Sequence, residues 1–255
     1  MEGDKSAGLT EMELKTHPMI KFISYGNKRF TQSRKRIENE ANALNFFTRV
    51  KIHTERSIRE LPEFDTAILS QEFKNVFHER RGGGYWLWKP LIVYEELKKM
   101  NENDILFYAD SGCSIPNNGQ TIKKLKKYAD ITENHETGIL AFRNPHKEST
   151  WTKSDVFDHF GVLTREEIYN TQQISANRFV IRKCDKSVEL VKMWWDTAGK
   201  YPHLFSDQKS KIPNFKNFRQ NRHDQSNWSV ICKKHNVAQD YKWKEQAIKL
   251  TRKRR

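Results

Sequence analysis

The chain has 255 residues, of which 12% are aromatic, and this content argues against a disordered protein; the length suits one large domain or two small ones. Its net charge of +14 favours anionic partners such as phosphate-rich small molecules or an acidic membrane surface. Because that charge is spread along the chain, direct nucleic-acid binding is not expected. Three widely spaced cysteines without a CxxC pair argue against a disulfide framework or a structural zinc site and fit a reducing, cytoplasmic compartment.

Residues 1–17 are typical of a disordered leader and lack the apolar stretch of a signal peptide. No run of about eighteen apolar residues follows, so a membrane-spanning helix is not expected. Apolar periodicity and turn residues then predict alternating elements in the first half of the chain: a strand at 19–25, a helix at 32–44, a strand at 50–53, a helix at 64–77, an irregular glycine loop at 80–84, a helix at 85–100 and a strand at 105–108.

The second half continues the alternation, with predicted elements at 123–128 (helix), 138–142 (strand), 153–160 (helix), 164–167 (helix start), 174–182 (strand), 187–197 (helix) and 224–232 (helix). Thr152 is expected to cap the helix at 153, Thr164 to open a capping box, and Asp224 to cap the last helix. Strands alternating with helices predict an α/β fold: a single domain at 18–240 with a mainly parallel, mixed central sheet flanked by helices, followed by a basic tail at 241–255.

Asp110 stands directly after the apolar strand at 105–108. Ligands of α/β proteins bind beyond the carboxyl ends of the strands, and a carboxylate there can hold a divalent cation that bridges phosphate oxygens. Gly112, two residues later, permits a close approach of backbone to ligand. The alternative is that Asp110 only begins a turn, as aspartate commonly does.

A glycine triplet beside two arginines precedes this strand by one helix. Glycine lets backbone approach a phosphate, and Arg80 and Arg81 could bind phosphate oxygens in pairs. The spacing matches neither the P-loop nor the dinucleotide fingerprint, so a plain surface connection is the alternative. Lys89 and Lys153 are further candidates for diphosphate contact, with surface lysine as the alternative for each. Trp86 and Trp88 lie two apart, so that one is expected to pack and the other to stack on a sugar or base.

Two segments carry a family resemblance. Gly84-Tyr-Trp-Leu-Trp-Lys-Pro90 followed by Asp104-Ile-Leu-Phe-Tyr-Ala-Asp-Ser-Gly-Cys113 resembles a family of small glycosyltransferases found in bacterial capsule and lipopolysaccharide gene clusters and in large DNA viruses. Weaker matches are 22–26, Trp151-Thr152-Lys153 with Asp155, 173–177 and 222–226, so that the resemblance spans roughly residues 19–236.

The resemblance implies a GT-A-like fold, a hexosyltransferase activity with a nucleotide-sugar donor (UDP-linked in the first instance), a glycan or glycoconjugate acceptor, and Mn²⁺ or Mg²⁺ as cofactor. It places the nucleotide base near Tyr25, and it puts Asn177 and Gln225 beside the donor. The family's acidic motif is Asp-x-Asp, whereas this chain has Tyr108-Ala109-Asp110 and keeps only the second acid. The resemblance therefore implies that the metal borrows another ligand, and His223 is the best candidate, since imidazole and carboxylate both suit Mn²⁺.

The catalytic base is left between two acids. Asp224 could accept hydrogen bonds from donor-sugar hydroxyls, act as the general base toward the acceptor hydroxyl, or cap a helix. Asp155 is the second candidate for the general base. The alternative is that it is an ordinary carboxylate on the face of a helix.

Four functions compete at this stage. The first is metal-assisted glycosyl transfer. The others are a glycoside hydrolase, which needs two carboxylates around one bond, a catalytically inactive nucleotide-sugar or carbohydrate-binding relative, and a basic nucleic-acid-binding module. Peripheral membrane contact through the basic tail is expected to accompany the first.

Overall fold

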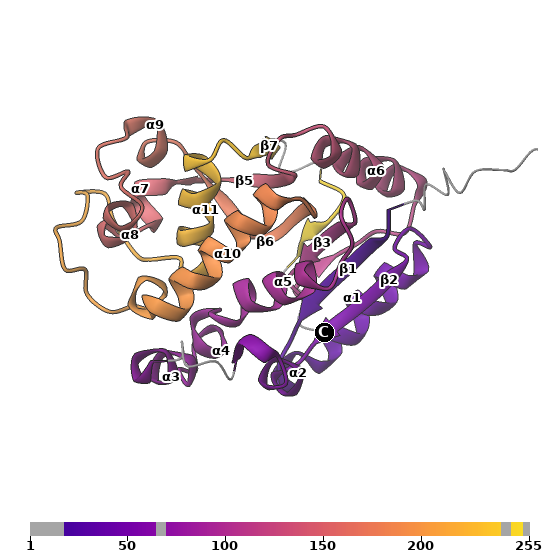
Figure 1. The fold of residues 1–255 in the computed structure, drawn as a ribbon, viewed down its shortest axis with the longest axis horizontal. Coiled ribbons are helices and arrows are strands. Elements are labelled where there is room, and N and C mark those ends of the chain that lie inside the picture. The colour runs from indigo at the N-terminus through magenta and orange to yellow at the C-terminus, as the bar shows by residue number, and fades with distance from the viewer. Residues whose placement is uncertain (1–17, 65–69, 241–245, 252–255) are drawn as a thin grey trace, which may run out of the picture.

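The computed structural model describes residues 18–64, 70–240 and 246–251. Its core is a six-stranded sheet in the order β2-β1-β3-β6-β5-β7 (Figure 1). These strands are Ile20–Tyr25 (β1), Arg49–His53 (β2), Ile105–Ala109 (β3), Ile139–Lys147 (β5), Gln172–Arg182 (β6) and Ala238–Asp240 (β7). Strand β1 pairs in parallel with β2 and β3, and β5 with β7, whereas β6 is antiparallel to both β3 and β5. The predicted α/β fold with a mainly parallel, mixed sheet is confirmed.

Helices cover both faces of the sheet because the central strands are apolar on both sides. In β1, Ile23 faces the core shared with the helices Trp88–Lys98 (α5), Asp185–Lys200 (α10) and Asp224–Lys234 (α11). Its neighbour Phe22 faces the core shared with the helices Thr31–Ala43 (α1) and Gly119–Glu133 (α6). Strand β3 alternates in the same way, with Leu106 on the first side and Phe107 on the second. Uninterrupted apolar runs are typical of such doubly covered strands.

The helices alternate with the strands along the chain. They are Thr31–Ala43 (α1), Glu55–Arg59 (α2), Gln71–Phe77 (α3), Gly82–Tyr85 (α4), Trp88–Lys98 (α5), Gly119–Glu133 (α6), Glu148–Trp151 (α7), Ser154–His159 (α8), Glu166–Tyr169 (α9), Asp185–Lys200 (α10) and Asp224–Lys234 (α11), with 3-10 turns at Lys28–Phe30, Pro62–Phe64 and Pro202–Phe205. None of the described helices is long and apolar enough to cross a membrane.

Several predicted boundaries are wrong. The helix predicted at 64–77 begins only at Gln71, after a 3-10 turn and residues 65–69, which lie outside the described part. The helix predicted at 85–100 begins at Trp88, because the two residues at 85 and 86 have left-handed backbone angles. At α8 the predicted cap Thr152 donates to Glu148 instead, and the predicted capping box at the start of α9 makes no cap hydrogen bond.

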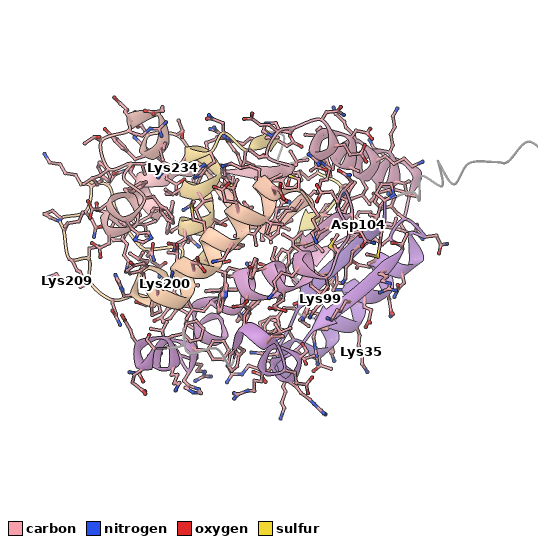
Figure 2. All side chains as sticks on the ribbon, in the orientation of Figure 1. Lys35, Lys99, Asp104, Lys200, Lys209 and Lys234 are labelled. Atoms are coloured by element: carbon pink, nitrogen blue, oxygen red, sulfur yellow. The ribbon has the colours of Figure 1, made fainter. Side chains whose placement is uncertain are left out.

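The last described residues pack on the domain. Strand β8 (Lys249–Leu250) pairs with β4 (Cys113–Ser114), and Ala247 and Ile248 are buried. The stretch assigned to a basic tail thus includes residues that belong to the fold, while 241–245 and 252–255, like the predicted leader at 1–17, lie outside the described residues. Figure 2 shows the exposed Lys35, Lys200 and Lys209 well apart, in keeping with dispersed positive charge.

The face covered by α10 and α11 holds a cluster of buried aromatic rings. Trp194 is fully buried, with its ring 4.7 Å from that of Trp228 and 6.1 Å from that of Phe179. The interpretation of Trp194 and Trp195 as core residues is confirmed, since both are buried.

Replacing Trp194 by alanine should lower the free energy of unfolding by about 3–5 kcal/mol, because a large buried side chain leaves a cavity. Tyr201→Ala is the control, since Tyr201 is 43% exposed and should cost far less. Urea titration followed by circular dichroism measures both. Equal losses for the two variants would contradict the assignment of this cluster as the core.

Candidate functional site

Asp110 lies where the sequence predicted it, just beyond the carboxyl end of β3. Its backbone N–H donates to the Asn177 carbonyl of β6 (2.8 Å), and its own carbonyl accepts from Cys113 (2.8 Å), which closes a tight turn. Because β1 and β3 are parallel, the end of β1 at Tyr25 lies at the same edge of the sheet. The Asp110 side chain is 31% exposed, so it faces both the protein and the solvent.

A buried lysine joins Asp110 to the second half of the chain. Lys89 lies in the first turn of α5 and is 2% exposed. Its ammonium is 3.1 Å from Asp110 Oδ1 and 2.5 Å from Asp224 Oδ2, and it donates to the Ala176 carbonyl at 3.0 Å. The Tyr108 hydroxyl donates to the same Asp110 oxygen at 2.6 Å. We refer to Lys89, Asp110 and Asp224 as the lysine cluster.

Electrostatics within the lysine cluster keep the lysine charged and make one acid unusually basic. Burial raises the pKa of Asp224 to about 6, against the opposing effect of the Lys89 ammonium. Burial alone would lower the pKa of Lys89, but the Asp110 and Asp224 carboxylates more than offset it and raise that pKa above its usual value. At neutral pH Lys89 is therefore an ammonium and Asp224 a carboxylate.

Arg178 adds a second buried cation beside Asp110. It is 4% exposed, donates to Asn177 Oδ1 at 2.7 Å, and interacts electrostatically with Asp110. Burial lowers its pKa, but an arginine remains charged at neutral pH. Asp110 thus interacts with two buried cations, Lys89 and Arg178.

The glycine triplet forms a left-handed turn. Five consecutive residues have positive φ: Gly82 (60°), Gly83 (59°), Gly84 (88°), Tyr85 (49°) and Trp86 (59°). Each residue with a side chain costs about 1–2 kcal/mol in this conformation. At Gly84 a Cβ would also lie 2.4 Å from the Phe77 carbonyl oxygen. The prediction that 80–84 has no regular structure is corrected to a short left-handed turn, which brings Tyr85 and Trp86 to face the second half of the site.

The His223 ring packs against the rings of Tyr85 and Trp86. Its ring centroid is 4.9 Å from that of Tyr85 and 5.4 Å from that of Trp86, and its backbone (φ 59°, ψ −119°) lies outside the regions that side-chain-bearing residues favour. Its Nδ1–H donates to the Phe205 carbonyl (2.7 Å), and burial lowers its pKa to about 4, so the imidazole is neutral. His223, rather than Asp224, occupies the cap position of α11, which corrects the predicted cap and leaves the Asp224 carboxylate to Lys89.

Arg80 and Arg81 are exposed at the start of the left-handed turn. Arg81 makes an ion pair with Asp207 at 2.7 Å. Asp207 also accepts from the Tyr85 hydroxyl and lies 3.9 Å from His223 Nε2. No sequence signal pointed to Asp207, because it stands in an irregular segment far from every motif. Tyr108 could have been found, since residues two apart on a strand share a face and it is therefore beside Asp110.

Lys153 and Asp155 anchor a loop. The Lys153 ammonium donates to the carbonyls of His203 and Gln208, and the Asp155 carboxylate accepts from the backbone N–H groups of Lys211 and Ile212. Both side chains therefore serve the segment after α10 rather than the lysine cluster. Their predicted roles in diphosphate binding and base catalysis stay predictions with these competing contacts.

The remaining predicted residues surround the lysine cluster. Gln225 donates to Gln173 at 2.6 Å and accepts from the Ala176 N–H, so it fixes α11 against β6. Tyr25 and Trp88 pack ring on ring, with centroids 3.8 Å apart, whereas Trp86 lies on His223, so the two tryptophans do take different partners. Asn177 holds Asp110 through its carbonyl and Arg178 through its side chain.

These contacts argue against the predicted Mn²⁺ or Mg²⁺ site. Asp110 faces Lys89 and Tyr108, whereas the His223 imidazole faces Asp207, which is already paired with Arg81. Among the described residues, no three His, Cys, Asp or Glu side chains could hold a metal ion together. The residues present therefore do not fit a cation shared by Asp110 and His223.

No protein-family model and no curated protein matches the sequence. The solved structures that are similar to the chain include a glycosyltransferase involved in glycosylation of the major capsid of PBCV-1 (12% identity, 72% of this chain and 68% of that chain, TM-score 0.37), mouse xyloside xylosyltransferase 1 (11%, 88% and 84%, 0.45), and the glycosyltransferase GlyE of Streptococcus pneumoniae (10%, 89% and 46%, 0.40). The chain spans about half the length of GlyE.

The left-handed turn can be tested by its glycines. Gly161→Ala adds a Cβ in open space at a positive φ (65°) and should cost about 1–2 kcal/mol of unfolding free energy. Gly84→Ala adds the same strain plus a backbone clash, so it should cost clearly more. Gly119→Ala, in a helix and without close neighbours, should be neutral or stabilising. Urea unfolding measures all three, and a Gly84→Ala cost no larger than that of Gly161→Ala would contradict this packing.

Proposed function

We propose that the chain is a glycosyltransferase that moves a sugar from a nucleotide diphosphate-sugar to a hydroxyl of a glycan or glycoconjugate. The observation that carries the proposal is the lysine cluster: a buried ammonium that joins two carboxylates at the carboxyl edge of the parallel strands, where α/β proteins bind ligands. Lys89, Asp110 and Asp224 all lie in segments that resemble small glycosyltransferases.

Asp224 is the general base in this proposal. Its pKa of about 6 leaves it ionised at neutral pH, yet more basic than an ordinary aspartate, which suits proton removal from an acceptor hydroxyl. The hydroxyl oxygen forms a bond to the anomeric carbon as the bond to the diphosphate breaks, and its proton passes to Asp224. The Lys89 ammonium holds the carboxylate in place.

The donor's phosphates are assigned to the left-handed turn. Arg80 and Arg81 are exposed there, and the turn lies near the end of β1, since a Cβ added at Gly83 would be 3.9 Å from the Tyr25 hydroxyl and the Trp88 indole nitrogen. Arginine binds phosphate oxygens with two N–H groups at once. The buried Tyr25–Trp88 pair packs beside this turn, and we assign the nucleotide base to its neighbourhood.

A glycoside hydrolase is the second candidate, because Asp110 and Asp224 face one another across a single ammonium. Hydrolases of this kind place two carboxyl groups on either side of the bond that breaks. Here Lys89 fills the space between the two carboxylates, so a glycosidic bond does not fit between them. Release of nitrophenol from aryl glycosides without any nucleotide would favour the hydrolase.

Binding of a nucleotide is the first test. Titration calorimetry with UDP and GDP should give saturable binding to the native protein, and Arg80→Ala/Arg81→Ala should weaken it by about tenfold or more, since phosphate-binding charges are lost. Lys126→Ala/Lys127→Ala, which removes two exposed lysines of α6, is the matched control. Failure of every nucleotide diphosphate to bind, with or without a divalent cation, would end the proposal.

The pH profile tests Asp224. The active form is the carboxylate, so kcat/KM for a nucleotide-sugar should fall as the pH drops through about 6, the pKa of the buried acid. Asp224→Asn should lower turnover by about 10²–10⁴-fold, whereas the exposed Asp158→Asn should retain it. A flat profile between pH 5 and 8, or a fully active Asp224→Asn variant, would assign the base elsewhere.

A further inference from the structure

The GT-A resemblance implies a divalent cation at Asp110, yet a cation of the protein's own already lies there. Lys89 Nζ is within 3.1 Å of Asp110 and 2.5 Å of Asp224. A metal ion that used both carboxylates would need the position that the ammonium occupies. The Lys89 side chain cannot move aside cheaply, because it is buried and its third partner is the Ala176 carbonyl.

The carboxylates of the lysine cluster already have cationic partners in the protein. Both pair with the Lys89 ammonium, and the buried Arg178 guanidinium interacts electrostatically with Asp110. One Asp110 oxygen also accepts from the Tyr108 hydroxyl, which replaces the first acid of the Asp-x-Asp motif. A tyrosine at that position takes up a lone pair of Asp110 instead of adding a second anionic ligand, so it favours an ammonium over a divalent ion.

We infer that Lys89 takes the place of the divalent cation in this protein, and that the lysine cluster is a metal-independent form of the site. The part of this inference that concerns the reaction rests on the proposed transferase function. Lys89 then fixes the two carboxylates, while Arg80 and Arg81, which are exposed, offset the charge that develops on the leaving diphosphate.

Lys89 does not replace every property of a metal. Its ammonium pairs with two carboxylates and donates to the Ala176 carbonyl, and the side chain is 2% exposed, so it is not open to a phosphate. It acts as a positioning residue: it holds Asp224 in place for proton removal and fixes the Asp110 side chain at the edge of the site.

Manganese binding tests the inference without any substrate. Titration of the native protein with Mn²⁺, followed by electron paramagnetic resonance of the free ion, should show no site at Asp110 at sub-millimolar concentrations. Lys89→Ser leaves Asp110 and Asp224 facing a vacated space, and two such carboxylates should gain Mn²⁺ affinity by about tenfold or more. The double variant Lys89→Ser/Asp110→Asn should lose that gain.

Lys233→Ser is the matched control. Lys233 is another buried lysine, but it pairs with a single carboxylate, Glu148, which already accepts from Ser229 and Gln173. Its removal should create no Mn²⁺ site. If Lys89→Ser does not fold, the native protein decides alone: Mn²⁺ binding that Asp110→Asn abolishes overturns the inference, and its lack supports it.

Turnover separates this inference from the proposed function. Release of nucleoside diphosphate from a panel of UDP- and GDP-sugars should agree within about twofold in EDTA and in Mn²⁺. A loss of about tenfold or more in EDTA, restored by Mn²⁺, overturns the metal-independent site and leaves the transferase standing. Lack of turnover in both conditions would count against the transferase, and the Mn²⁺ titration would then decide the role of Lys89 by itself.

Discussion

The structure of the site depends on one interaction, the burial of the Lys89 ammonium between Asp110 and Asp224. A charge that is 2% exposed is costly unless its partners are well placed, and removing one partner of such a group typically costs several kcal/mol. Its contacts tie α5 to β3, α11 and β6, so four elements distant in sequence must dock correctly before the charge is satisfied. The same requirement that stabilises the fold therefore aligns the two carboxylates.

Backbone strain is concentrated around this cluster. The left-handed turn at 82–86 leads directly into the helix that carries Lys89, and the unusual backbone of His223 leads directly into Asp224. The two strained segments contact each other through Tyr85, Trp86 and the His223 ring. Strain of this kind persists only where surrounding contacts over-determine it, and it gathers at functional sites. Here it sets the directions from which Lys89 and Asp224 enter the site.

Much of the fold follows from local pattern. The apolar runs of β1 and β3 and the position of Asp110 after the second were predictable, because strand periodicity and the carboxyl-edge rule are local. The start of α5 at Trp88 was not, since a left-handed conformation at Tyr85 and Trp86 depends on contacts with His223. The pairing of Lys89 with Asp224 could not be predicted from the sequence either, because the two residues are far apart along the chain. Sequence could not rank Asp155 against Asp224 as the base, because the backbone N–H groups at 211–212 that bind the Asp155 carboxylate belong to an irregular segment far along the chain.

A crystal structure of the native protein with UDP in the presence of Mn²⁺ tests the account most directly. The account predicts the diphosphate on Arg80 and Arg81 at the left-handed turn, with Lys89 still bound to both carboxylates and no ion between them. A nucleotide bound away from the carboxyl edge of β1 and β3, or a manganese ion between Asp110 and Asp224 with Lys89 displaced, would contradict it.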